Sequence, residues 1–342
     1  MKNQPTNTSR GLLVASLFVA LSSSPPAQQQ ATTLLALSQR ADVVALATVT
    51  ANTDPSPALR RVAFRLDRAF KGSVPGHFAL IEGAGRCCGR ALVGTIPTQQ
   101  YLLFLQRKGP TLHPLGGERG LVRPDARLLG HIEALLGATT HTAQQDLLVD
   151  ALDSPDRRIR ADAALALQVL PTLTNRGATT SKVMAALRRE LPEGSTLVPS
   201  LLDVTLRTDP DSAATALTDI YLETKRPDTS KLLRATLCRL PAQRVRDQLL
   251  QANVVNRQDL EPRLRAAELL QSMPAPDNIR ILDLMLAKAE LPRLELAITE
   301  ALLAAKVPAT QLRARVATPV LELAQKRREE RARFRLPSRR VR

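Results

Sequence analysis

Side chains that commonly carry out chemistry are scarce in this chain, which has four His and three Cys among 342 residues. Cys87 and Cys88 are adjacent, where a mutual disulfide would strain the intervening peptide, and Cys238 lies far away. Neither the CxxC nor the HxxxH spacing of a zinc site occurs. We therefore predict unpaired or partly paired thiols and no metal. The alternative is a loop disulfide, or a metal site that includes His77 or His113.

Catalytic motifs are also missing from the sequence. No Gly-rich phosphate loop with its Lys and no GxSxG nucleophile turn is present. His131 and His141 are spaced so that they do not share a helix face. Asp150, Asp153 and Asp156 resemble a ladder of metal ligands, but the last two fit a helix boundary better. We expect no catalytic residue and no cofactor, and we predict that the protein is not an enzyme.

The positive charge is concentrated in two regions of the chain, residues 31–125 and residues 326–342. The formal net charge is +16, a value typical of nucleic-acid-binding proteins. However, residues 126–325 contain 25 basic and 24 acidic residues, whereas residues 326–342 contain 9 basic and 2 acidic ones. Aromatic residues make up only 2% of the chain, too few for a platform on which bases stack. A nucleic-acid partner is therefore disfavoured, and an acidic polymer is the weaker alternative to a protein partner.

The first 27 residues have the pattern of a secretory signal peptide. Lys2 and Arg10 precede an uncharged apolar run at residues 11–21, and small residues follow it. Cleavage after Ser22 or after Ala27 fits this pattern, and we predict export to the periplasm or the extracellular space. No later segment is apolar over the length needed to cross a bilayer, so we expect no integral membrane segment in the mature chain. Residues 28–40 are predicted to be a linker.

Residues 41–125 have the pattern of a small β domain. Val43, Ala45, Ala47 and Val49 alternate with other residues and would share one face of a strand. Residues 101–105 form a continuous apolar run, which predicts a strand buried on both faces or a barrel stave. About five short strands would form a small closed barrel or sandwich.

Three short motifs of this region, Ala41–Val44, Phe70–Gly72 and Tyr101–Leu105, resemble the netrin/tissue-inhibitor-of-metalloprotease module. This resemblance implies an OB-like barrel. The inhibitors of that family use an N-terminal Cys to chelate the metal of a protease, and no Cys follows the leader here. The resemblance therefore implies the fold and not protease inhibition.

Residues 126–325 change to helical periodicity with short breaks at Pro, Gly and Asp. The stretch of residues 147–171 predicts a helix that ends near Leu152 and a second helix that ends at Pro171. Asp153 or Ser154 would cap the second helix, and Pro155 would lie in its first turn. This stretch resembles a HEAT repeat of the type found in bacterial lyase-like HEAT proteins. The residues that carry the repeat signature, with structural roles, are Asp153, Pro155, Ile159, Arg160, Ala163 and Leu167.

Fainter copies of this pattern end at Pro241, Pro274 and Pro308, which are 33 and 34 residues apart. A helix pair that repeats with this period predicts an α-solenoid of five or six pairs. The register between residues 172 and 230 stays open, and an ordinary helical bundle is the alternative. The predicted fold class is thus α+β, with a small N-terminal β barrel or sandwich followed by an α-solenoid of HEAT-like helix pairs.

The C-terminal segment 326–342 is predicted to be the basic end of the last helix and a tail. It can contact an anion or be only a solvated helix end. Arg60 and Arg61 in the β domain form a second candidate anion surface. The candidate contacts in the C-terminal segment are Arg327, Arg328, Arg331, Arg333, Arg335, Arg339 and Arg340.

Together these features predict an exported, non-catalytic interaction or scaffold protein. It would bind another protein through the HEAT-like solenoid and the β domain. The alternative is a binder of acidic polymer or nucleic acid that uses the basic tail and the β domain. The sequence does not indicate the oligomeric state.

Overall fold

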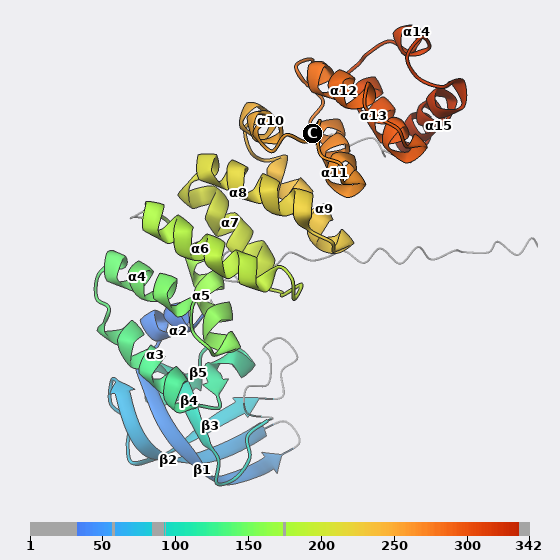
Figure 1. Ribbon diagram of the computed structural model, residues 1–342. Helices are drawn as coiled ribbons and strands as arrows, with labels where there is room; N and C mark the ends of the chain where they lie inside the picture. The colour runs from blue at the N-terminus through green and yellow to red at the C-terminus, as the bar shows by residue number, and fades with distance from the viewer. Residues whose placement is uncertain (1–32, 57–58, 84–91, 93, 174–175, 335–342) are drawn as a thin grey trace, which may run out of the picture.

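A computed structural model describes residues 33–56, 59–83, 92, 94–173 and 176–334 (Figure 1). Several sequence-based predictions lie outside these residues: the signal peptide, the cysteine pair at 87–88, and Arg335, Arg339 and Arg340. Within them, a curled antiparallel sheet in the N-terminal part is followed by a long series of helices (Figure 1).

The sheet has the strand order β3-β2-β1-β4-β5, and β6 also pairs with β4. All of these pairings are antiparallel. The register of β1 on β2 shifts several times, while β1 on β4 runs without a shift. These irregularities bend the sheet until β3 contacts β5, which produces a half-barrel. The strands are β1 (Val43–Ser56), β2 (Leu59–Lys71), β3 (His77–Gly83), β4 (Gln100–Lys108), β5 (Thr111–Pro114) and β6 (Leu121–Val122), with a 3₁₀ turn at Gly117–Gly120.

Strands β1 and β4 are buried on both faces, as the apolar run at residues 101–105 predicted for β4. On one face, Val43 and Phe64 belong to the core inside the curled sheet, together with Leu103. On the other face, Val44 and Phe104 belong to a second core that continues into the helices. The sheet therefore shares a core with the helical part.

Residues 34–40, which we expected to lie in a linker, form helix α2 (Leu34–Arg40). Thr33 caps this helix, and Leu34, Leu35 and Leu37 are buried. The backbone N–H of Leu34 donates to the side chain of Asp162, 128 residues later, at 2.7 Å. Because these leucines pack against the helical part, this segment is a structural element rather than a spacer.

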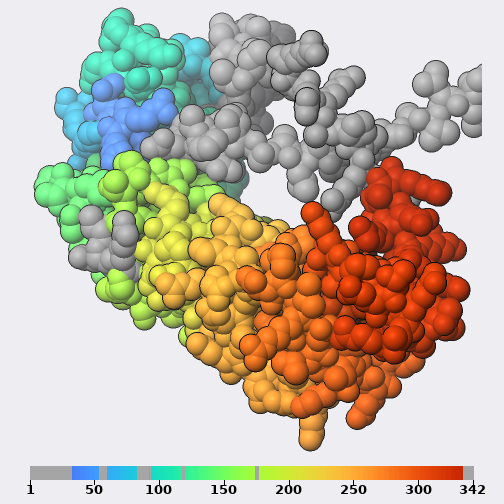
Figure 2. All heavy atoms as spheres, turned by 90° about the horizontal axis from the view of Figure 1, so that it is seen from above, coloured from blue at the N-terminus to red at the C-terminus, as the bar shows by residue number. Residues whose placement is uncertain are grey.

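The helical part begins at residue 126, and its helices follow one another in space from the sheet to the C-terminal end (Figure 1). In Figure 2 they form an arc. Most contacts join helices one or two positions apart in the chain, such as α4 with α5 and α6, or α13 with α11 and α15. The helices are α3 (Ala126–Gly137), α4 (His141–Ala151), α5 (Arg157–Val169), α6 (Arg176–Glu190), α7 (Val198–Thr208), α8 (Pro210–Glu223), α9 (Pro227–Leu237), α10 (Ala242–Gln251), α11 (Leu260–Ser272), α12 (Asn278–Leu286), α13 (Pro292–Ala304), α14 (Ala309–Leu312) and α15 (Thr318–Phe334).

The signature stretch forms α4 and α5, and its predicted buried face is confirmed. Ile159, Ala163 and Leu167 are at most 3% exposed. The cap differs from the prediction, because the side chain of Asp156, rather than Asp153 or Ser154, accepts the N–H of Arg158. Pro155 therefore lies in the turn before α5 and not in its first turn. All three candidates are typical capping residues, and only the position at which the chain turns decides between them.

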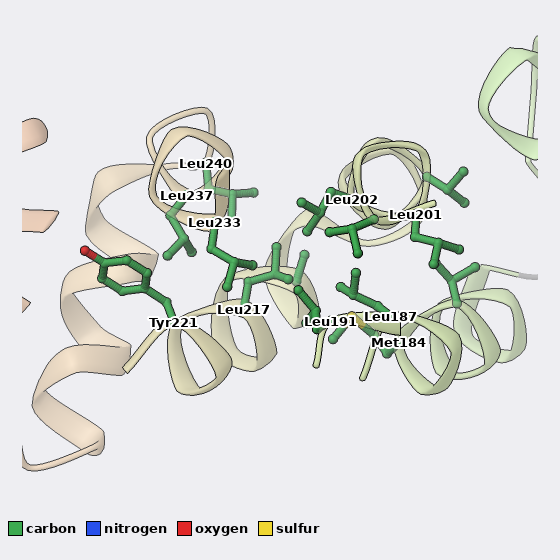
Figure 3. Close-up of a cluster of buried hydrophobic side chains, with 14 of the residues drawn as sticks. Met184, Leu187, Leu191, Leu201, Leu202, Leu217, Tyr221, Leu233, Leu237 and Leu240 are labelled. Atoms are coloured by element: carbon green, nitrogen blue, oxygen red, sulfur yellow. The ribbon is translucent and has the colours of Figure 1, made fainter. Parts of the chain in front are cut away.

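The segment whose register stayed open contains α6, α7 and α8. Helix α7 ends at Thr208, and Pro210 follows as the first residue of α8. The boundary between these two helices could not be recognised from the sequence, because Pro210 both follows one helix and begins the next. The four helices α6 to α9 pack through buried leucines, with Tyr221 at the end of the cluster (Figure 3).

Candidate functional site: an arginine-rimmed groove

A groove of about 1170 Å³ lies beside α11, α13 and α15, near the C-terminal end of the helical part. Its apolar floor comes mainly from Leu296 and Ala297 of α13 and from Val320 and Leu323 of α15. The apolar residues Val320, Leu321, Leu323 and Ala324 predict one packed side of α15, but Leu323 is 42% exposed. The packed side is instead formed by Leu321 and Ala324, since those side chains are buried.

The charge of the groove is predominantly positive. Five arginines and two glutamates line it, and none of its described lining residues is aromatic. The arginines come from three separate helices, so no run of basic residues in the sequence revealed them as a group. They are Arg234 on α9, Arg293 on α13, and Arg327, Arg328 and Arg331 on α15.

Glu300 is the central polar residue of the groove. Its side chain is only 7% exposed and accepts from Arg327 at 3.3 Å and from Arg331 at 2.9 Å. Gln271 of α11 donates to the same carboxylate at 3.1 Å. A buried carboxylate needs such partners, because an unpaired charge away from water is costly. Glu300 thus fixes α15 beside α13 and holds two arginines at the edge of the groove.

The other arginines of the groove are bound less tightly. Arg234 pairs with Glu268 at 3.2 Å, and Arg293 pairs with Glu261 at 3.3 Å at an exposed position. Arg328 is exposed and has no hydrogen bond or ion pair with any of the residues that the structure describes. Exposed pairs of this kind contribute at most about 1 kcal/mol, so these guanidinium groups can exchange partners at little cost.

The structure separates the predicted anion contacts into two groups. Arg327, Arg328 and Arg331 line the groove, and Arg333 is exposed near the end of α15. Arg60 and Arg61 lie on β2, at the opposite end of the molecule (Figure 1). The two surfaces therefore do not combine into one site.

Several basic residues of the β domain have structural partners. Arg68 pairs with Glu133 of α3, and Arg65 pairs with Asp67. Lys71 donates to the carbonyl oxygens of Ser38 and Gln39 at the end of α2. The positive charge of this domain is therefore partly used in joining it to the helices.

Arginines in the helical part also bind carbonyl groups at helix ends. Arg207 of α7 donates to the carbonyls of Leu167, Gln168 and Leu170 at the end of α5. Such carbonyls lack partners within their own helix, so a guanidinium group from a neighbouring helix satisfies them. Arg189, Arg226 and Arg265 make similar contacts with carbonyls of Leu152, Pro192 and Leu222.

Arg160, one of the residues of the signature stretch, contacts the turn before its own helix and the next helix. It donates to the carbonyls of Ser154 and Pro155 and pairs with Glu190 of α6 at 2.9 Å. Burial alone raises the pKa of the Glu190 carboxyl, but the Ser195 side chain and Arg160 outweigh this effect, so its pKa is lowered. The pair therefore joins α5 to α6 with an ionised carboxylate.

Among the described residues, the His, Cys, Asp and Glu side chains that could take part in metal binding or catalysis do not come together in one site. Over the part of the chain that the structure describes, no group of three His, Cys, Asp or Glu residues is placed to hold a metal ion. His113 makes a hydrogen bond with Thr111, and burial lowers the pKa of His131. Cys238 is unpaired and exposed. Among the described helices, none is long and apolar enough to span a bilayer.

No family model matches this chain, and no curated protein is significantly similar to it. The HEAT-like and netrin-like resemblances consequently rest on the residues and the architecture alone.

Proposed function

We propose that the helices form a HEAT-like solenoid of six pairs, from α4/α5 to α14/α15. Side-chain contacts between helices recur at a nearly constant sequence separation. The separation is 34 residues for Gln145 with Thr179 and for Arg234 with Glu268, and 32 for Arg293 with Glu261. A chain in which each unit contacts mainly the next unit gives this pattern, whereas a closed bundle also brings distant helices together. The curled sheet fits a partly open OB-like barrel, as the netrin resemblance implies.

We propose that the protein is an exported, non-catalytic interaction protein that binds another protein through this helical array. The observation that carries the proposal is the groove beside α11, α13 and α15, which combines an exposed apolar floor with arginines at its edge. Arginine is enriched in protein interfaces, and the buried centre of an interface is more apolar than the rest of the surface. Solenoids also use their extended surfaces for binding, so the architecture supports the same conclusion.

Site-directed photo-crosslinking in the native host tests this function. A photo-reactive residue in place of Leu323, in the groove, is expected to give a discrete adduct with a second protein. The matched control is Leu284 on α12, which is 46% exposed but does not line the groove. Equal labelling at the two positions, or no adduct at Leu323, would contradict the proposal.

A second candidate function is the binding of an acidic polymer. It is favoured by the segment 326–342, with 9 basic and 2 acidic residues, because Arg333 is exposed and has no ionic partner among the described residues. Binding of this kind would be electrostatic and would weaken steeply with salt.

A further inference from the structure

We infer that the groove takes an acidic, leucine-bearing segment of a partner protein, bound along α13 and α15. The inference rests on the proposed function and specifies the chemistry of the partner. It is carried by the order of apolar and charged residues along the two helices. Leu296 and Leu323 each lie four residues, or about one helical turn, before Glu300 and Arg327, which pair with each other.

The apolar part of the groove excludes a purely ionic ligand as its best occupant. Leu323 is 42% exposed, and Val320 and Leu296 are partly exposed beside it. A sulfated sugar or a phosphate backbone has no alkyl side chain to cover these residues. A peptide with leucines does, and burial of its leucine side chains against the groove would add to the affinity.

The charged residues of the groove favour an occupant with negative charge. Arg328 has no partner among the described residues, and Arg293 is held only by an exposed pair with Glu261. Arg331 already binds the Glu300 carboxylate through one of its nitrogens, and a guanidinium group has further N–H donors that a second carboxylate can accept. With five arginines against two glutamates, carboxylates of a partner would be attracted and a basic segment repelled.

Fluorescence anisotropy with a labelled peptide tests the inference on the full mature chain. The probe is Glu-Leu-Leu-Glu-Asp-Leu-Glu-Glu-Leu-Leu, and its analogue carries Ser in place of each Leu. We expect the leucine peptide to bind at least about tenfold more tightly than the analogue, with part of the affinity retained at high salt. Equal binding of both peptides would overturn the inference and favour a purely electrostatic surface.

Matched variants assign any binding to the groove. Arg328→Glu and Leu323→Ser are each expected to weaken the peptide at least about tenfold, and both positions are exposed, so folding should be retained. Arg313→Glu and Leu284→Ser, exposed positions outside the groove, should change the affinity less than about twofold. Equal effects at groove and control positions would overturn the assignment.

The two proposals fail in different ways. A crosslinked partner at Leu323 without binding of the acidic peptide would refute the inference and leave the interaction function standing. Absence of both would refute both. Competition by heparin as strong as competition by the leucine peptide would show that the occupant is an acidic polymer.

Discussion

Single charged residues join neighbouring helices in this protein, and the pair of Arg160 and Glu190 shows how. The side chain of Glu190 is 1% exposed and that of Arg160 is 15% exposed, so water screens neither charge strongly. Loss of one partner leaves the other uncompensated in the interior, which typically costs more than the pair contributes when intact. The contribution of this pair should therefore depend on the ionisation of Glu190.

Glu190→Gln is expected to lower the free energy of unfolding by about 2–3 kcal/mol at pH 7. The pKa of Glu190 is lowered in the folded protein from its ordinary value of 4.5. The carboxylate therefore stabilises the fold fully at pH values above 4.5. This contribution is lost as the pH falls through the lower folded pKa. The difference between wild type and variant, measured by urea denaturation, should therefore shrink as the pH falls below 4.5.

The control for this prediction is Glu193→Gln, since Glu193 is exposed and lies three residues away. It should change stability by less than about 0.5 kcal/mol at every pH. A difference for Glu190→Gln that stays constant between neutral and acidic pH would show that the carboxylate is not the source of the stabilisation.

At the scale of elements, the faces of the helices follow from spacing, while their precise ends do not. Ile159, Ala163 and Leu167 recur at helical intervals, and the structure buries all three. The start of α5 was less predictable, because Asp153, Ser154 and Asp156 can all cap a helix. Helix α2 was missed for a related reason: seven residues with three buried leucines are too short to show a clear period.

Ile159→Asp is expected to destabilise the helical part by about 4 kcal/mol, because it places an unpaired charge in the core between helices. The matched control is Arg158→Asp, one residue earlier and exposed, which should change stability by no more than about 0.5 kcal/mol. Thermal and urea melts of the two variants measure the difference. If both variants melt alike, the assignment of the buried face is wrong.

At the scale of the whole molecule, the sequence predicted the order of its parts better than its candidate site. The change of periodicity at residue 126 marked the boundary between sheet and helices, and the structure places α3 there. The groove was not predictable, because Arg234, Arg293 and Arg328 come from three helices whose packing must be known first. The sequence did not indicate that Leu323 would be exposed either, since a single leucine at the edge of the apolar face of a helix can be buried or exposed.

The basic C-terminal segment is expected to determine retention of the protein on heparin. Substitution of Arg333, Arg335, Arg339 and Arg340 by Gln removes charge but keeps Arg327 and Arg331, which Glu300 requires. This variant should elute at clearly lower salt with unchanged far-ultraviolet circular dichroism, because contacts between exposed charges are screened. Deletion of the whole segment 326–342 is less informative, since it leaves Glu300 without either arginine.

The matched control substitutes four basic residues of the β domain, Arg61, Arg65, Lys108 and Arg123, by Gln. Its elution should shift less than that of the C-terminal variant. If only the control shifts, the anion-binding surface lies on the sheet and the end of α15 is merely solvated.

The contact of Leu34 with Asp162 also constrains the order in which the chain can fold. The two residues are 128 positions apart, so this hydrogen bond cannot form until α5 has been made, whereas α2 also contacts β4 and α3, which come earlier in the chain. Closing so long a loop is slow, so α2 lacks its contacts with α5 until late in folding. Helix α2 would thus be among the last elements to complete its native contacts. Its leucines would be a natural binding site for a chaperone until then.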